Sequence, residues 1–590
     1  MAIKRNEVKL DDKWDLSSLC KDYEEWATRF KAFETGLLTQ SGTFKGKLGD
    51  KATLFQAFNY LEEANKELEV IHSYAFLNYE TNGSDSTNQS MVSQSGNLVS
   101  KFYASIAYFD SELLELSESY LEDFIKDEKA KNYKVYIQKL LDVKPHMLSE
   151  KEERLLALSS QPLSVPHKAF QTLNNVDFKF EPVFGEELTH ATYQTFLLSD
   201  KEEVRREAYK NYYKSYLSHE NTLADLYQGS INKDIFIAQA RNFNSSLETA
   251  LDPDKVPLSV YKSLIEVVNE SLPILHRYYA LLAKKLKKDK IKHYDVYLPL
   301  CDNIEFNISY DEAITLIKNS ITCLGEEYSN TLIKGLTSEH WVDRYENVGK
   351  SSGAFSAGCY TGKPYILTNY NPKLVRSVST LIHEGGHSMH SYYSKNNNPI
   401  LSYDYTIFEA EVASTFNEEL LSTYMIANAK TKEEKAYLIS SKLSNIVATL
   451  FRQTMFAEFE MIVHEKVEHG EMATLSMLRG EYRKLLTKYF GPQVELEEYS
   501  DLEGLRIPHF YSAFYVYKYA TGVSAAIALS QKVLNGTEKD RDAYLAFLKS
   551  GGSKYPIEAL KGAGVDMSNP EVVRQAVAYF SRLLDLAEAL

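Results

Sequence analysis

Apolar residues recur at every third or fourth position through much of the chain, which is the spacing of an amphipathic helix. Residues 54–79 and 98–116 both show it, and the polar stretch 81–90 between them predicts a loop. The first proline is Pro145. The part of the chain before it therefore lacks the residue that most strongly breaks helices. We therefore expect an N-terminal helical domain spanning 1–190.

Two short regions depart from the helical spacing. Residues 174–190 alternate polar and apolar side chains around Pro182 and Gly185, which predicts a short hairpin or edge segment. Residues 351–371 combine aromatic and β-branched side chains with three glycines and predict one or two strands; the glycines are Gly353, Gly358 and Gly362. Such a strand can expose an edge that hydrogen-bonds an extended peptide, or it can form a buried structural hairpin. The residues leave both interpretations open.

Composition favours a mainly helical fold. Only 26 Gly and 15 Pro occur among 590 residues, and few such breakers mean long helices and few tight turns. The chain also holds 42 Tyr. Four of them lie at helical spacing within 201–218 and predict packing; they are Tyr209, Tyr212, Tyr213 and Tyr216. We expect a mainly α fold with a small β-sheet.

Charge and cysteine content narrow the choice of partners. The net charge of −15 argues against nucleic acid, whose binding needs clustered Lys and Arg. No uncharged apolar stretch is long enough to span a membrane, and the first residues lack the apolar core of a secretory signal. The four cysteines form no CxxC pair, which argues against a disulfide framework. We expect a cytoplasmic protein that binds neither nucleic acid nor membrane.

The segment HEGGH (383–387) is an HExxH motif within a predicted helix, 372–394. At about 100° per residue, His383 and His387 lie roughly 40° apart on one face, so both imidazoles can bind one metal ion. Glu384 is adjacent and can act as a base toward a water on the metal. Each glycine costs about 1 kcal/mol of helix propensity relative to Ala, so the pair indicates that backbone or substrate packs very close.

A second pair, His464 and His469, has a spacing of five residues and provides a comparison. That spacing rotates the second ring by about 140°, off the shared face. We interpret this pair as solvated helix surface.

A catalytic zinc site needs a third protein ligand and one open position. A metzincin would carry glycine and histidine where this chain has His390 and Tyr393, which excludes that class. A carboxylate from the next predicted helix, within 404–427, is the alternative. Glu409 and Glu411 lie on different faces of that helix, and spacing alone leaves both open.

These two segments together resemble the M3 family of zinc oligopeptidases, and most closely its oligoendopeptidase F branch. The family pattern is HExGHxxH followed by a Glu that opens E-x-x-S-x-x-x-E, which Glu411, Ser414 and Glu418 match. The resemblance extends to the strand segment 353–371 and to RIPHFYSAFYVYKYATG (506–522).

The resemblance implies one Zn²⁺ ion held by His383, His387 and Glu411. His390 matches the family's extra His and would support these ligands, although its helix face could also present it to the metal. Glu418, one heptad past Glu411, would be either a supporting carboxylate or a surface residue. In such a site, the Glu that follows the first His of the motif accepts a proton from zinc-bound water as that water attacks the peptide carbonyl.

The segment 506–522 carries groups suited to stabilising an oxyanion. His509 and Tyr511 can each donate a hydrogen bond to the charge that develops on the scissile carbonyl. They follow Pro508, so we expect them to project from a loop. In the M3 family a His and several Tyr of this region line the cleft; the resemblance carries that role onto His509 and Tyr511, and less directly onto Tyr515.

The sequence therefore predicts a zinc-dependent endopeptidase that hydrolyses internal bonds of short oligopeptides, with a catalytic domain over 191–590. The strand around Gly358 and Tyr360 would bind the extended substrate backbone. The resemblance implies a large helical metallopeptidase fold, with the small sheet near the zinc and a deep substrate channel that excludes folded proteins. A helical zinc carboxypeptidase and a zinc-binding scaffold without turnover are the alternatives; the intact Glu384 argues against the scaffold.

Overall fold

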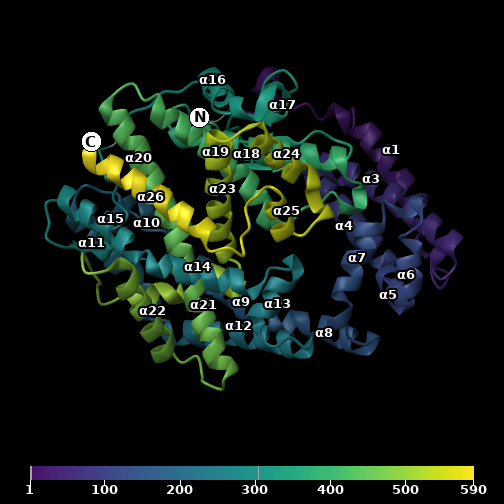
Figure 1. Cartoon of the computed structure of the whole chain (residues 1–590), viewed down its shortest axis with the longest axis horizontal. Helices are drawn as coiled ribbons and strands as arrows, with labels where there is room; N and C mark the ends of the chain where they lie inside the picture. Colours follow the sequence, from purple (N-terminus) through teal and green to yellow (C-terminus); the bar gives the residue numbers. More distant parts are fainter. Residues whose placement is uncertain (1–2, 303) are drawn as a thin grey trace. The chain divides into compact units, whose positions relative to one another are not determined.

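The computed structural model describes residues 3–302 and 304–590, and it is mainly helical, as predicted (Figure 1). The chain folds into two compact units whose segments alternate along the sequence. Unit 1 comprises Met1–Pro145, Glu305–Met425 and Leu529–Gly564; unit 2 comprises His146–Ile304, Ile426–Ala528 and Val565–Leu590. This grouping differs from the single boundary expected at residue 190, and that boundary stays a prediction.

Unit 1 holds the helices of both the N-terminal region and the HExxH segment. Its helices are α1 (Tyr23–Thr35), α2 (Leu37–Gln40), α3 (Lys51–Thr81), α4 (Ser86–Ile106), α5 (Tyr108–Glu115), α6 (Glu118–Phe124), α7 (Lys134–Val143), α16 (Tyr310–Ser320), α17 (Gly325–Leu336), α18 (Val375–Asn397), α24 (Glu538–Ser550) and α25 (Pro556–Gly562). Helix α19 (Ile407–Ala427) begins in unit 1 and ends in unit 2.

Unit 2 is built from the remaining helices. They are α8 (Glu150–Leu163), α9 (Val165–Thr172), α10 (His190–Leu197), α11 (Glu202–Leu217), α12 (Glu220–Ala240), α13 (Ser246–Leu251), α14 (Leu258–Glu270), α15 (Leu272–Lys285), α20 (Lys432–Ile446), α21 (Arg452–Glu468), α22 (Leu475–Phe490) and α26 (Glu571–Ala589). Helix α23 (Tyr517–Asn535) begins in unit 2 and ends in unit 1. Two short strands, β1 (Ile291–Lys292) and β5 (Val494–Glu495), pair in parallel.

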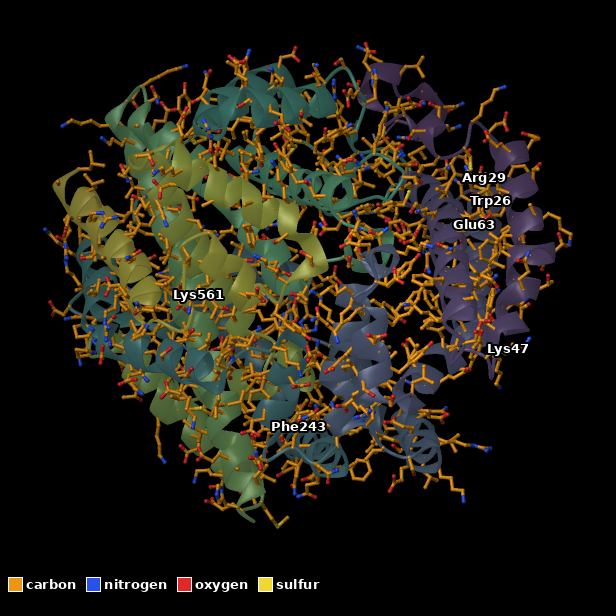
Figure 2. All side chains as sticks on the ribbon, turned by 45° about the vertical axis from the view of Figure 1, so that its right-hand side comes forward. Trp26, Arg29, Lys47, Glu63, Phe243 and Lys561 are labelled. Atoms are coloured by element: carbon orange, nitrogen blue, oxygen red, sulfur yellow. The ribbon has the colours of Figure 1, made fainter. Side chains whose placement is uncertain are left out.

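The N-terminal helices α1, α3 and α4 pack around the apolar face that the spacing of α3 predicted. Asp50 caps α3 by accepting a hydrogen bond from the amide of Thr53. Trp26 of α1, labelled in Figure 2, is buried against α3 and donates from its indole nitrogen to the carbonyl of Ile71 at 2.9 Å. Each large apolar side chain buried here stabilises the unit by about 1.5–3 kcal/mol.

Two predicted segments have different boundaries in the structure. Residues 98–116 form parts of two helices, because the chain turns at Ala107 between α4 and α5. The loop expected over 81–90 is shorter, because Asp85 caps α4 by accepting from the amide of Asn88.

The hairpin expected over 174–190 is reduced to one bridge. A π-helical turn, Leu173–Asp177, follows α9. Beyond it, only Val183 and Glu186 pair, across the tight turn at Gly185, whose φ of 88° favours glycine.

The strands predicted within 351–371 are confirmed. They are β3 (Phe355–Ala357) and β4 (Tyr365–Leu367), paired antiparallel with Ser356 opposite Ile366. Strand β2 (Val342–Asp343) runs parallel to β4 on its other side, so the order is β2-β4-β3. Strand β4 is buried, whereas β3 is half-buried and lies at an edge of the sheet. The small sheet therefore contains a half-buried edge strand, β3, and a buried strand, β4, so it has features of both interpretations that the sequence left open.

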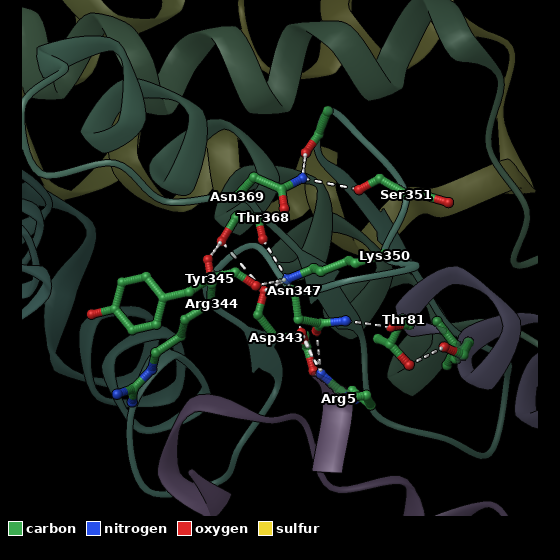
Figure 3. Close-up of polar contacts among 12 residues, drawn as sticks. Arg5, Thr81, Asp343, Arg344, Tyr345, Asn347, Lys350, Ser351, Thr368 and Asn369 are labelled. Atoms are coloured by element: carbon green, nitrogen blue, oxygen red, sulfur yellow. Dashed lines mark hydrogen bonds and ion pairs between the residues drawn. The ribbon is translucent and has the colours of Figure 1, made fainter. Parts of the chain in front are cut away.

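A buried ionic network joins the N-terminal segment to this sheet (Figure 3). Arg5 donates to both carboxylate oxygens of Asp343, at 2.9 and 2.5 Å. Lys350 pairs with Asp343 at 2.8 Å, and both side chains are fully buried. The ammonium of Lys350 also donates to the carbonyls of Tyr345 and Thr368, at 2.7 and 2.6 Å. Removing one partner of such a pair costs about 3–5 kcal/mol, so the network fixes the end of β2.

Among the residues that the structure describes, no helix is both long enough and apolar enough to cross a membrane.

Candidate metal centre

Helix α18 carries the HExxH motif, and it begins at Val375 rather than at position 372. His383 and His387 lie one turn apart, with ring centroids 4.8 Å from each other and planes nearly perpendicular. The two imidazoles share one face of α18, as the spacing predicted.

The two glycines of the motif let neighbouring helices approach α18. A Cβ on Gly386 would lie 2.7 Å from the Cα of Ser414 and 2.8 Å from the carbonyl oxygen of Ala413, so the backbone of α19 packs directly on it. A Cβ on Gly385 would lie 3.1 Å from the Leu332 side chain of α17. Close packing was predicted from the glycine pair, and the structure shows that a helix backbone fills the space at Gly386.

This close crossing brings a carboxylate of α19 to the two His. Ligand atoms of His383, His387 and Glu411 lie within 4.8 Å of one another, and they are the one such group found among the described residues. The Glu411 Oε2 atom is 3.8 Å from His383 Nε2. Glu409 is 1% exposed and accepts instead from the amide of Thr406 at the start of α19. Of the two acids that the spacing left open, Glu411 is the one beside both His.

Glu418 lies on the other side of the His383 ring. Its Oε1 atom is 2.6 Å from His383 Nδ1, a charge-assisted hydrogen-bond distance. A carboxylate on Nδ1 holds the proton there and turns the Nε2 lone pair toward Glu411. This is the supporting position that the resemblance implied for Glu418.

The electrostatics of the cluster suit a cation. Burial lowers the pKa of His387 to about 3, so this imidazole is neutral and its lone pair is available. Burial also disfavours charge on His383, but the hydrogen bond that its Nδ1 donates to Glu418, together with the nearby carboxylates, outweighs burial and raises the pKa to about 9. A metal ion bound at Nε2 would therefore displace a proton from this ring. Two imidazoles and one carboxylate are a donor set that zinc takes in catalytic sites.

Glu384 is 7% exposed beside these residues. Burial raises its pKa to about 7, with the charge of His383 opposing that rise and the charge of Glu411 adding to it. A hydrogen bond from the Ser356 amide lowers the pKa slightly, which places Glu384 against the edge strand β3. Ser356 also pairs through its hydroxyl with Ser388 of α18 at 2.8 Å. Sequence reasoning missed Ser356, although it lies in the strand that the glycine pattern had marked.

His390 packs away from the ligand atoms. It is 1% exposed, and its ring stacks on Tyr405 at 3.6 Å and lies 5.4 Å from Phe547. Burial lowers its pKa to about 3, so it is a neutral core residue. It supports α18 and is not part of the ligand group, in line with the expectation from the resemblance.

Gly358 and Tyr360 occupy the turn after β3. A Cβ on Gly358 would lie 2.6 Å from the carbonyl oxygen of Lys363, so only glycine fits this approach. The Tyr360 amide donates to Glu69 at 2.8 Å, and its hydroxyl donates to the carbonyl of Asn398 at 3.0 Å. These contacts fix the turn, and the substrate role of both residues stays a prediction.

His509, Tyr511 and Tyr515 belong to unit 2. His509 is exposed, with Tyr515 stacked at a centroid distance of 6.4 Å. Tyr511 does not project from a loop: it ends a 3₁₀ turn, Pro508–Tyr511, and is 3% exposed because its ring stacks on Phe170 at 4.4 Å. The expectation failed because the proline starts a compact turn whose aromatic side chains are buried, Tyr511 against α9 and Phe510 against α12 and α21. The Tyr511 hydroxyl has no hydrogen-bond partner among the described residues.

The interpretation of His464 and His469 as solvated surface is wrong for His464. This residue is 1% exposed, and it bonds the carbonyl of Glu460 and, at 3.4 Å, the carboxylate of Asp234. His469 is exposed, as expected. The spacing correctly predicted that the two rings do not share a face. It gave no information on which face of α21 is packed.

Comparisons with known proteins identify the family. A model of peptidase family M3 matches residues 195–579, and a model of oligopeptidase F matches residues 112–180. The chain belongs to peptidase family M3. This M3 peptidase is 40% identical to an oligoendopeptidase F homolog of Borreliella burgdorferi over 585 residues, which cover 99% of each chain. It is also 40% identical to oligopeptidase PepF of Bacillus subtilis over 593 residues, or 99% of this chain and 88% of the relative.

A solved structure confirms the fold of this M3 peptidase. The oligoendopeptidase-F from Enterococcus faecium aligns with a TM-score of 0.72 and 32% sequence identity, covering 96% of this chain and 98% of the other. The family and the mainly helical fold predicted from the motifs are therefore confirmed. The chain is a peptidase with a candidate His-His-Glu metal site.

Proposed function

We propose that this M3 peptidase is a zinc endopeptidase that cleaves internal bonds of short peptides. The observation that supports it most is the convergence of His383, His387 and Glu411 beside the buried acid Glu384. The relatives are named oligoendopeptidase F and oligopeptidase, which supports peptides as the substrate class.

His383, His387 and Glu411 would hold the zinc ion. A zinc ion bound there supplies Lewis-acid chemistry and makes water a stronger nucleophile near neutral pH. Glu418 fixes the His383 tautomer through Nδ1, so that Nε2 faces the other two ligands.

Glu384 would act as the general base and then as the general acid. It takes a proton from the attacking water and delivers it to the leaving amine. A pKa of about 7 suits both steps near neutral pH, because the carboxyl can then gain and lose a proton readily.

The edge strand β3 lies against Glu384 and could pair with an extended peptide backbone. Gly358 and Tyr360 would shape the end of that strand. In unit 2, His509 and Tyr511 would donate hydrogen bonds to the oxyanion, and Tyr515 would contact substrate. The partnerless hydroxyl of Tyr511 supports this role, because a buried unpaired hydroxyl needs an explanation such as a ligand.

We also propose a domain boundary and a cellular location for the chain. The division into 1–190 and 191–590 is supported by the family models, which match 112–180 and 195–579. A cytoplasmic location is supported by the four cysteines, all of them free.

The proposed function is tested with a short peptide blocked at both ends, by acetyl and amide groups. We expect internal cleavage, seen by mass analysis of the products, that a chelator stops and added Zn²⁺ restores. A folded protein containing the same peptide sequence serves as the size control and should remain intact. Release of single C-terminal residues from an unblocked peptide, with no cleavage of the blocked one, would instead indicate a carboxypeptidase.

A further inference from the structure

The chain between the 3₁₀ turn Pro508–Tyr511 and α23 passes through one strained residue. Phe514 has a φ of 60°, in the left-handed region. For a bulky residue this conformation is unfavourable and persists only where the surroundings enforce it. Phe514 is also 2% exposed, so the strain lies in the packed interior of unit 2 and not in a free loop.

One buried side chain holds the amide of this residue. The Phe514 N–H donates to Oε1 of Glu460 in α21, at 3.0 Å. Glu460 is 0% exposed, and burial raises the pKa of its carboxyl well above the usual range. The side-chain oxygen Oε2 has no partner among the described residues. The hydrogen bond from the Phe514 amide is thus the polar contact that explains why a Glu side chain occupies this buried position.

Helix α21 also packs on the Phe514 ring. The His464 ring is 4.6 Å from it, and the Tyr261 ring of α14 is 5.9 Å from it. His464 is in turn fixed by its bond to the carbonyl of Glu460. Backbone and ring of the strained residue are therefore held by the same turn of α21.

The strained residue lies between the two groups that we assign to the oxyanion and the one that we assign to substrate contact. His509 and Tyr511 precede it, and Tyr515 follows it directly. A change of φ at one residue redirects the whole chain on either side of it, so release of Phe514 would move these side chains by ångströms. Misplacement of catalytic groups by about 1 Å can cost a hundredfold in rate.

We propose that Glu460 is a positioning residue: its side-chain oxygen Oε1 holds the Phe514 amide in the left-handed turn and thereby sets the places of His509, Tyr511 and Tyr515. The part of this inference that concerns rate rests on the proposed function of those residues. The part that concerns the turn stands on the geometry of unit 2 alone.

The role requires an acceptor atom at a given reach and not a charge. Glu460→Gln keeps an oxygen acceptor of the same length, whereas Glu460→Met keeps the volume and removes the acceptor. Glu460→Asp keeps the acid but shortens it by one methylene, which takes the acceptor out of hydrogen-bond range. Glu460→Asp therefore serves as the second variant if Glu460→Met does not fold. Glu465→Met, at an exposed position of the same helix, is the matched surface control.

Hydrogen–deuterium exchange of the zinc-loaded full chain reports the turn directly. We expect exchange over 508–516 to be about tenfold faster or more in Glu460→Met and Glu460→Asp. It should be unchanged in Glu460→Gln and Glu465→Met. Unchanged exchange in both Met and Asp variants, or equal acceleration in Gln, would overturn the positioning role.

Peptide turnover separates this inference from the proposed function. We expect kcat to fall about tenfold or more in the Met and Asp variants with a smaller change in KM, and rescue by Gln. Tyr511→Phe, measured in parallel, should lower kcat in the same way. Faster exchange over 508–516 with an unchanged kcat would overturn the catalytic consequence, and an unchanged kcat in Tyr511→Phe would locate that failure in the proposed oxyanion role.

Discussion

At the scale of single residues, the centre depends on which nitrogen of His383 faces which acid. Glu418 holds Nδ1 at 2.6 Å, and this leaves Nε2 for the group that includes Glu411. Glu384 lies next in the chain and differs in chemistry, because burial raises its pKa to about 7. The three carboxyl groups thus differ in position and burial, and we propose a different task for each.

The proposed base is tested by Glu384→Gln. The amide keeps the shape but cannot accept the proton, so we expect kcat to fall by about 10²–10⁴. Zinc content, measured by mass spectrometry of the metal, should stay near one ion per chain. Glu326→Gln, an exposed acid on α17, is the control. Near-normal turnover with zinc bound would contradict the mechanism.

The proposed third ligand is tested by the pair Glu411→Gln and Glu409→Gln. An amide oxygen is a weaker ligand than a carboxylate, so the first change should lower zinc affinity by tenfold or more, on the order seen for changes around metal sites. Glu409 is close in sequence but bonds the Thr406 amide, so its variant should keep zinc. Competition with a chromogenic chelator measures both, and equal loss of metal would undo the assignment.

At the scale of elements, the site exists because α18 and α19 cross with almost no side chain between them. Gly386 permits this crossing, since a Cβ there would lie within 2.8 Å of two backbone atoms of α19. The same helix α18 packs against β3 through Ser388, so one element carries two of the candidate metal ligands and contacts the edge strand. A change at this crossing should therefore affect metal and substrate together.

Gly386→Ala tests the crossing. The added methyl forces the helices apart, and we expect a loss of about 1–3 kcal/mol in the free energy of unfolding together with weaker zinc binding. Gly96→Ala in α4 is the matched control, because nothing lies within 4 Å of its Cβ position. It should be neutral or stabilising by up to about 1 kcal/mol. Denaturant unfolding and metal content measure both variants; an unperturbed Gly386→Ala would contradict the packing argument.

At the scale of the whole molecule, stability depends on groups buried far from the centre in sequence. In unit 2, burial lowers the pKa of His293 to about 4, so it folds as a neutral imidazole. Glu503 remains ionised beside Arg452 and Arg506, which hold its pKa at about 2 despite burial. Unfolding exposes both groups to water, where their pKa values return to about 6.5 and 4.3.

These shifts fix the sign of the pH dependence. The folded pKa of His293 is depressed, so between about pH 6.5 and pH 4 the unfolded chain binds a proton that the folded chain refuses. Stability therefore falls as pH falls through this window. The contribution of Glu503 is lost only below about pH 4.3, because its folded pKa is about 2.

We expect the free energy of unfolding to fall by roughly 2 kcal/mol from pH 7 to pH 5 through His293 alone. His293→Gln should remove that part of the slope, whereas the exposed His219→Gln should leave it in place. Denaturant titrations at the two pH values measure the difference. Equal slopes in the wild type and His293→Gln would show that this residue does not carry the effect.

Much of the site was readable before the fold was known, for specific reasons. HExxH spacing is a property of one helix, so His383, Glu384 and His387 follow from the local geometry of α18. The glycine pattern likewise located β3 and β4. His464 and Tyr511 were misjudged because burial depends on which neighbouring elements cover a face, and the residue types around them do not encode that.

The sequence by itself therefore determined the helical class, the family, the two His of the centre and the strand segment, because each depends on local spacing or on a contiguous motif. Helix spacing left Glu411 and Glu409 open and the resemblance implied Glu411, but only the tertiary structure shows Glu411 beside both His, since that placement depends on how α19 crosses α18 at Gly386. It also placed Glu418 on His383 and Glu460 on Phe514, contacts 35 and 54 residues apart in the chain. Contacts of that range are set by the packing of helices, which no local pattern specifies.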